Sequence, residues 1–247
     1  MHIDVVANIG EARSDDFIHK TVIVIDVLRA TSTIITALMN GCKAIFPVET
    51  VLRAKELFRD GDLLGGERYC KKIPGFHFGN SPLEYTAEAV QGRRIFLTTT
   101  NGTRSIQKAT KADHVLAGAL TNSKSCARVA IDFKKDVVIV CAGTQDVFSL
   151  EDGLCAGLIL AEFRTMLSEN EITMNDLGLV LHGFYLQSKD HILETLLSCT
   201  NGKKLSKSGF HTDVIYCARA NSTEEVPILE GDQMILLPHH PSALPSF

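Results

Sequence analysis

The chain has 247 residues, of which 45% are hydrophobic and 22% are charged, a balance typical of a globular protein with a large core. Its 25 basic and 29 acidic side chains give a formal net charge of −4, and the sequence contains no block of like charges. This pattern argues against nucleic acid or an anionic membrane as a partner and favours a small-molecule ligand.

The N-terminal residues and the cysteines predict a cytoplasmic protein. Residues 1–5 include an acid and lack the basic and apolar segments of a secretory signal, and no apolar run reaches the ~18 residues of a membrane span. The seven cysteines are an odd number, lie far apart and mostly sit in apolar stretches, as in cytosolic proteins. We expect them to be buried thiols, except Cys70 in a polar loop.

Two stretches of the chain show the same alternation of apolar strands, polar loops and amphipathic helices. The first has strands at 22–26 and 44–48 and helices at 31–38 and 51–58. The second has strands at 94–97 and 114–118 and helices at 105–109 and from about 121. Because Ile34 and Ala37 align with Ile106 and Ala109 at a shift of about 72, we interpret residues 20–92 and 93–165 as copies of a duplicated βαβα unit.

A third strand, loop and helix follow at 136–144 and 150–166. Alternation of this kind predicts an α/β fold with three layers, in which helices cover both faces of a mainly parallel sheet. The tail differs, because strands are indicated at 213–218 and 233–237, joined by a polar link, after a Lys/Ser-rich segment at 203–209 that resembles a mobile loop. We expect one unit, 1–247, with a mixed C-terminal addition at 175–247.

The carboxyl ends of parallel strands meet at one edge of a sheet, where ligands usually bind. Asp26 ends the first apolar strand, and an acid there is costly to bury without a cation or several donors. It is a candidate metal ligand, although an acid here can also cap the next helix. Arg29, Thr31 and Ser32 stand where a helix start would bind a phosphate, although such hydroxyls are also ordinary helix caps.

A second polar loop repeats these features with neutral groups and a glycine that permits close backbone approach. Its candidate substrate-binding residues are Thr99, Thr100, Asn101, Gly102 and Thr103. Gly143 belongs to the third loop of the same edge. Asn80 and Ser81 end an irregular segment rich in Gly, Pro and aromatic residues, which is typical of a substrate loop.

Three further acids are expected near this edge. Glu67 follows a Gly-Gly turn, and Glu151 and Asp152 begin the third helix, where acids also complement the helix dipole. Together with Asp26 they would offer the hard oxygen ligands that Mg²⁺ prefers. The sequence therefore predicts a Mg²⁺ site, with either Glu151 or Asp152 as a ligand.

Several motifs together resemble the 2-phosphosulfolactate phosphatase family. They are residues 24–32, Gly65-Gly66-Glu67, Gly79-Asn80-Ser81-Pro82, residues 99–103, and Cys141-Ala142-Gly143 followed by Leu150-Glu151-Asp152. The resemblance covers the first two thirds of the chain strongly and the tail around residues 218–221 more loosely. It implies a Mg²⁺-dependent hydrolase that converts 2-phospho-3-sulfolactate to 3-sulfolactate and phosphate, a step in coenzyme M synthesis.

The roles of single residues are inferred from physical chemistry. The haloacid-dehalogenase phosphatases, which also end a first strand in an aspartate, need a second acid two residues later, where this chain has Leu28. We therefore expect attack by water, with Asp26 and Arg29 as catalytic residues. Arg219, in the polar link of the tail, is our candidate for binding the sulfonate.

Two other functions stay open. One is a phosphatase of another phosphorylated hydroxy acid, and the other is a non-catalytic protein that binds phosphorylated metabolites. Converging carboxylates favour an enzyme, because they would repel the anion that a simple binder holds. The oligomeric state is also open, with a homodimer among the expectations.

Overall fold

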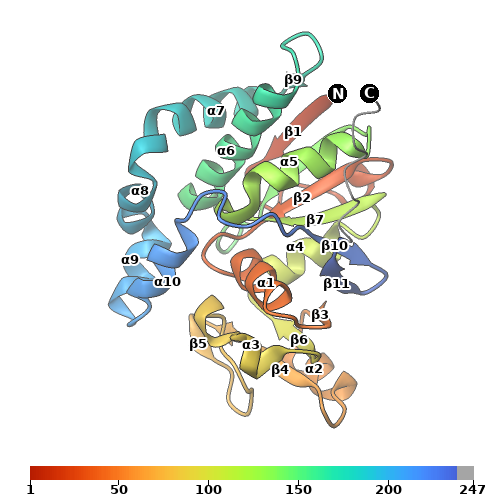
Figure 1. Cartoon of the computed structure of the whole chain (residues 1–247), viewed down its shortest axis with the longest axis vertical. Helices are drawn as coiled ribbons and strands as arrows, with labels where there is room; N and C mark the ends of the chain where they lie inside the picture. Colours follow the sequence, from red (N-terminus) through yellow and green to blue (C-terminus); the bar gives the residue numbers. More distant parts are fainter. Residues whose placement is uncertain (238–247) are drawn as a thin grey trace, which may run out of the picture.

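The computed structural model describes residues 1–237, and residues 238–247, the end of the expected addition at 175–247, lie outside the described part. One sheet of eleven strands runs through this part of the molecule (Figure 1). In spatial order the strands are β5 (Lys71–Lys72), β4 (Leu63–Arg68), β6 (Arg94–Thr98), β3 (Ala44–Pro47), β11 (Gln233–Leu236), β10 (Pro227–Glu230), β7 (His114–Gly118), β2 (Thr21–Ile25), β8 (Val137–Cys141), β1 (His2–Val6) and β9 (Thr173–Met174).

The helices fill the connections between these strands. They are α1 (Ala30–Met39), α2 (Val51–Leu57), α3 (Ala87–Val90), α4 (Gly102–Lys108), α5 (Ser123–Asp132), α6 (Leu150–Met166), α7 (Asp176–Ser188), α8 (Ile192–Ser198), α9 (Thr200–Lys207) and α10 (His211–Cys217). Short 3-10 turns occupy Ser14–Phe17, Pro82–Glu84, Leu120–Asn122 and Lys189–His191. Within residues 1–237, none of the helices combines the length and the apolar character that crossing a membrane requires.

The sheet consists of two parallel blocks joined by an antiparallel hairpin. Strands β7, β2, β8, β1 and β9 form one block, and β4, β6 and β3 form the other, with β5 antiparallel to β4 at its edge. The hairpin of β10 and β11 lies between β7 and β3 and pairs antiparallel with both. The expected mainly parallel α/β sheet is therefore confirmed, and the C-terminal strands lie at its centre.

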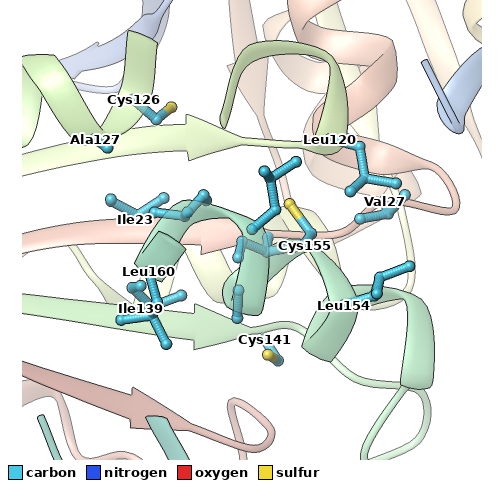
Figure 2. Packing of buried hydrophobic residues seen from close by; sticks show 14 of the residues in the cluster. Ile23, Val27, Leu120, Cys126, Ala127, Ile139, Cys141, Leu154, Cys155 and Leu160 are labelled. Atoms are coloured by element: carbon cyan, nitrogen blue, oxygen red, sulfur yellow. The ribbon is translucent and has the colours of Figure 1, made fainter. Parts of the chain in front are cut away.

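Alternating side chains of the buried strands supply two cores, one on each face of the sheet. In β2, Ile23 and Ile25 pack with α5 and α6, as Figure 2 shows for Ile23 among residues of this cluster. Val22 and Val24 point to the other face, where they pack with residues of α1 and α4. Because both faces are covered, the strand carries an unbroken apolar run. The three-layer arrangement follows directly from this packing.

The seven cysteines are free thiols, and all except the half-buried Cys70 are buried. Several of them pack among the apolar side chains of the α6 face, as Figure 2 shows for Cys126, Cys141 and Cys155. Burial raises the pKa of Cys126 to about 12, so this thiol stays protonated at neutral pH. These cysteines serve as small apolar residues of the core.

Two predictions for the C-terminal part of the chain were wrong. Residues 213–218, expected as a strand, belong largely to helix α10, because Val214 and Cys217 are buried three residues apart while Ile215 is 37% exposed. Segment 203–209, expected as a mobile loop, lies mostly in helix α9, anchored by the buried Leu205. A short apolar run is compatible with strand or helix, and the tertiary packing decides between them.

The expected βαβα order occurs twice, as β2-α1-β3-α2 and as β6-α4-β7-α5. Each strand of the first copy pairs with a strand of the second, β2 with β7 and β3 with β6. This order and pairing do not establish a duplication, which stays a prediction, as do the proposed boundaries at 20–92 and 93–165.

Candidate active site

A cleft lies where the loops that follow the parallel strands meet. The residues expected at the site that line it are Asp26, Arg29, Glu67, Asn80, Thr99, Thr100, Asn101, Gly143, Glu151 and Asp152. Loops from both parallel blocks, far apart in the chain, thus form one concave surface.

Asp26 follows the last residue of β2 and is 9% exposed. Its Oδ1 accepts a hydrogen bond of 3.1 Å from the Ala30 amide at the start of α1, and the Gly102 amide also donates to its carboxylate. Burial raises the pKa of Asp26 to about 7, and the neighbouring Glu67 and Glu151 carboxylates push it the same way. Among residues 1–237, this carboxylate forms no ion pair with a cationic side chain.

Asp152 in the first turn of α6 connects two of the loops that form the cleft. Its Oδ1 accepts a 2.9 Å hydrogen bond from the Val27 amide, and its Oδ2 accepts one of 3.1 Å from the Gly143 amide. Burial raises the pKa of Asp152 well above its ordinary value, and the Glu151 and Asp26 carboxylates add to the shift. Two amide donors therefore hold the carboxylate in place without balancing its charge.

The other two carboxylates are fixed by neighbouring loops. Glu67, near the end of β4, accepts hydrogen bonds at Oε1 from the Thr100 amide (3.1 Å) and hydroxyl (2.9 Å), and at Oε2 from the Cys70 amide (2.7 Å). Glu151 accepts a 2.6 Å hydrogen bond from the Asn201 side chain. Both carboxylates thus keep a fixed position at the cleft.

The backbone conformation of Gly66 allows strand β4 to place Glu67 at the cleft. Its φ is +141°, and a Cβ atom would meet the Thr98 carbonyl oxygen of the neighbouring strand β6. Only glycine tolerates this conformation and this close approach. The Gly65-Gly66 pair, expected as a turn before Glu67, therefore lies inside strand β4, where this backbone conformation and close packing require glycine.

Arg29 enters the cleft from a buried position. Its Nη1 donates to Asp213 Oδ2 of α10, and its Cζ lies 4.3 Å from the centre of the Phe210 ring. Ser81 Oγ donates a 2.9 Å hydrogen bond to the other oxygen of Asp213. Among residues 1–237, Asp213 is the hydrogen-bond acceptor of this guanidinium, so its remaining N–H groups are available to an anion.

The donor set of the cleft fits a hard divalent cation. Four carboxylates line it, while its lining cations are Arg29, already paired with Asp213, and Lys204. Asn80 adds a buried side-chain oxygen with no hydrogen-bond partner in the described part of the chain. Oxygen ligands in excess of positive charge are what Mg²⁺ requires. As they stand, however, no three acidic, His or Cys side chains of residues 1–237 form a ready-made metal group.

Several expected hydroxyls are used within their own loops. Thr31 Oγ1 accepts from the Asp26 amide, Ser32 Oγ donates to the Val27 carbonyl, and Thr103 Oγ1 donates to the Thr99 carbonyl. These three residues are buried, and the cleft lining does not include them. They shape the loops that hold Asp26 and Thr99, but they are not helix caps, because neither α1 nor α4 has a side-chain hydrogen bond at its N-cap.

The structure does not bring Arg219 to the cleft. It follows α10, is exposed, and its guanidinium carbon lies 5.3 Å from the centre of the Tyr216 ring. The expectation rested on a strand at 213–218, whose end would have reached the edge of the sheet. Because the segment is a helix, Arg219 leaves it in another direction.

Other residues of the cleft escaped the sequence analysis. Asn201, Lys204 and Leu205 of α9 line it, as do Tyr69 and Cys70 at the turn after β4. The buried Gly202 and Leu205 are three residues apart, a helical spacing that the surrounding Lys and Ser residues concealed. Asp213, the partner of Arg29, carried no signal, since an acid in a short apolar run indicates no particular partner.

These features define an α/β protein with an acidic cleft formed by the loops at the carboxyl ends of its parallel strands. The family model of 2-phosphosulpholactate phosphatase matches residues 8–232, and the chain belongs to this family. A probable 2-phosphosulfolactate phosphatase of Symbiobacterium thermophilum is 40% identical over 228 residues, which cover 91% of this chain and 97% of that protein.

Two clostridial relatives carry the same name. The protein of Clostridium tetani is 38% identical over 230 residues, covering 92% of this chain and 97% of its own. That of Clostridium novyi is 37% identical over 230 residues, covering 92% and 96%. The similarity extends over nearly the whole chain, so it includes the elements that form the cleft.

Proposed function

We propose that this protein is a Mg²⁺-dependent phosphatase that hydrolyses 2-phosphosulfolactate to sulfolactate and phosphate. The observation that carries the proposal is the meeting of four buried or nearly buried carboxylates and Arg29 in one cleft, in a chain of this phosphatase family. The place of the reaction in coenzyme M synthesis and a cytoplasmic location belong to the same proposal.

Asp26, Glu67, Glu151 and Asp152 would hold the Mg²⁺ ion, with the Asn80 oxygen beside them. The ion would supply positive charge that stabilises the phosphoryl oxygens. The raised pKa of Asp26 supports this role, because a carboxylate that burial leaves without a counter-charge gains most from a cation.

The chain's own residues bind and orient the phosphoryl group. Arg29 offers a planar guanidinium whose orientation Asp213 and the Phe210 ring fix, and such a group can bind two phosphoryl oxygens at once. Thr100 and Asn101, in the loop after β6, also line the cleft. Water attacks phosphorus and gives up a proton, the P–O bond to the ester oxygen breaks, and the alcohol oxygen takes the proton that the water loses.

The test is phosphate release by the purified protein from 2-phosphosulfolactate, 2-phospholactate and a neutral phosphate ester, with Mg²⁺ and with a chelator. We expect Mg²⁺-dependent release, fastest from 2-phosphosulfolactate. Asp26→Asn should abolish it, while Glu88→Gln, a change of an exposed acid on α3, should not. Absence of release from every ester in the presence of Mg²⁺ would overturn the proposal.

The same assay separates the alternatives. A protein that only binds phosphorylated metabolites would hold the esters without releasing phosphate, and four carboxylates around its ligand would weaken that binding. Faster release from a phosphorylated hydroxy acid without a sulfonate would assign another substrate to the same cleft.

A further inference from the structure

Helix α9 contributes one wall of the cleft through a single face. Asn201, Lys204 and Leu205 line the cleft, and their spacing of three and four residues places them on the same side of the helix. Asn201 fixes this side, because its side-chain amide donates to Thr144 Oγ1 (2.8 Å) and to Glu151 Oε1 (2.6 Å). Lys203 is on the same helix but does not line the cleft.

Lys204 has no ion-pair partner in the described part of the chain, unlike Arg29, the other cation that lines the cleft. The guanidinium of Arg29 is buried and already forms an ion pair with Asp213. Lys204 is exposed at the cleft and forms no ion pair with the residues that the structure describes. Its ammonium group therefore brings a positive charge and three N–H donors that no protein group neutralises.

The substrate of the proposed function has three anionic groups, namely the phosphate ester, a carboxylate and a sulfonate. The planar fork of an arginine matches the paired oxygens of a phosphate or a carboxylate. A lysine ammonium is a compact charge with three donors, which can bind the oxygens of a sulfonate. With Arg29 assigned to the phosphoryl group, Lys204 is the other cation of the cleft lining in the described part of the chain, and it can offset the repulsion between this second anion and the carboxylates.

We propose that Lys204 is the specificity residue that binds the sulfonate of the substrate, at the end of the molecule that does not react. This inference rests on the proposed function and assigns the sulfonate to α9. Lys204 acts on substrate binding and not on the phosphoryl group, so its contribution falls on KM.

The experiment compares the kinetics of the full-length protein, its Lys204→Met variant and its Lys203→Met variant, each with Mg²⁺. Methionine keeps the length of the side chain and removes its charge. For 2-phosphosulfolactate we expect Lys204→Met to raise KM about 10- to 100-fold with little change in kcat, the loss typical of one charged hydrogen bond. For 2-phospholactate, which lacks the sulfonate, KM should change less than about 3-fold. Lys203→Met should behave as the unmodified protein with both.

A second measurement uses binding alone. Calorimetric titration with 3-sulfolactate should show a similar loss of affinity in Lys204→Met and none in Lys203→Met. Equal losses for both esters would mean that Lys204 serves the phosphoryl group or the carboxylate, and unchanged kinetics would leave it without a role. Either result overturns the sulfonate assignment.

The two proposals fail in different ways. If the unmodified protein releases no phosphate from 2-phosphosulfolactate, the proposed function fails. Suppose instead that the unmodified protein is active and that Lys204→Met keeps the same ratio of kcat/KM between the two esters as the unmodified protein. The proposed function then holds and the sulfonate assignment fails.

Discussion

Arg29 and Asp213, 184 residues apart in the chain, form a buried ion pair beside the acidic cleft. Ser81 donates to the same carboxylate, so the pair connects the loop after β2, the loop before Pro82 and helix α10. Helix α10 thus holds Arg29 in place through Asp213, although no residue of α10 lines the cleft. An exposed arginine would be mobile, whereas this one is held on two sides by a carboxylate and an aromatic ring.

Replacing Asp213 should destabilise the fold. Asp213→Asn leaves the Arg29 charge buried beside a neutral amide, and removing one partner of a buried pair costs about 3–5 kcal/mol. We expect the free energy of unfolding in urea to fall by about 3 kcal/mol, since the asparagine oxygen still accepts a hydrogen bond. Asp15→Asn is the control, because its pair with Lys111 is more than half exposed and should contribute little. An equal effect of both changes would contradict this reading of the buried pair.

Arg29→Lys separates charge from shape at the same position. The lysine keeps a positive charge beside Asp213 but cannot present two parallel N–H groups to a phosphoryl group. We expect kcat/KM for phosphate release to fall about 10- to 100-fold, with most of the stability retained. Steady-state kinetics together with urea unfolding check both parts. Undiminished kcat/KM would remove Arg29 from phosphoryl binding.

The acidic cleft should make the metal-free protein less stable at higher pH. The pKa of Asp26 is about 7 in the folded protein because of burial, against 3.8 as its ordinary value. Between these values the folded state binds more protons than the unfolded state, so stability falls as pH rises from about 4 to 7. Burial and the nearby carboxylates raise the pKa of Asp152 as well, which acts in the same direction.

Urea unfolding in the presence of a chelator measures this effect. The midpoint should be lower at pH 8 than at pH 5.5, and Asp26→Asn should reduce the difference because the amide does not ionise. Added Mg²⁺ should restore stability at pH 8 more than at pH 5.5, since the metal needs the ionised carboxylates. A midpoint that rises with pH in the chelated protein would contradict the raised pKa.

The sequence predicted the sheet and the acids of the cleft for a simple physical reason. The run 22–25 is apolar at every position because both faces of β2 are covered, and an acid directly after such a run must lie at the carboxyl edge. Parallel pairing of β2 with β8 then places Gly143 and the nearby Asp152 beside Asp26, whereas Thr99 comes from the end of β6 in the other parallel block. Short-range pattern and sheet geometry are sufficient for this part of the site.

The α9 and α10 contributions could not be predicted in this way. Val214 to Cys217 is too short an apolar run for its period to distinguish a helix from a strand. Lys204 lies in the cleft because α9 packs on other helices through Leu205, a tertiary contact that leaves no local mark. Arg219 carried the expected charge, but the direction of a side chain depends on the element that holds it.

Gly102 should be needed at the start of α4 for the position of Asp26. A Cβ atom there would meet the Ala30 Cβ atom and would lie 2.7 Å from Asp26 Oδ2, both of them buried. Neither the Ala30 Cβ atom nor the fixed carboxylate can move aside freely. Gly102→Ala should therefore displace the carboxylate, lower kcat/KM about tenfold or more and weaken Mg²⁺ binding measured by calorimetry.

Gly183→Ala is the matched control for this change. Gly183 lies inside helix α7, and a Cβ atom added there meets nothing within 4 Å. Alanine favours a helix interior by about 1 kcal/mol over glycine, so Gly183→Ala should raise the free energy of unfolding and leave the kinetics unchanged. At Gly102 the same gain in helix propensity competes with the clash at Asp26. If Gly102→Ala also kept full activity and Mg²⁺ affinity, the carboxylate of Asp26 would not depend on this close approach of α4.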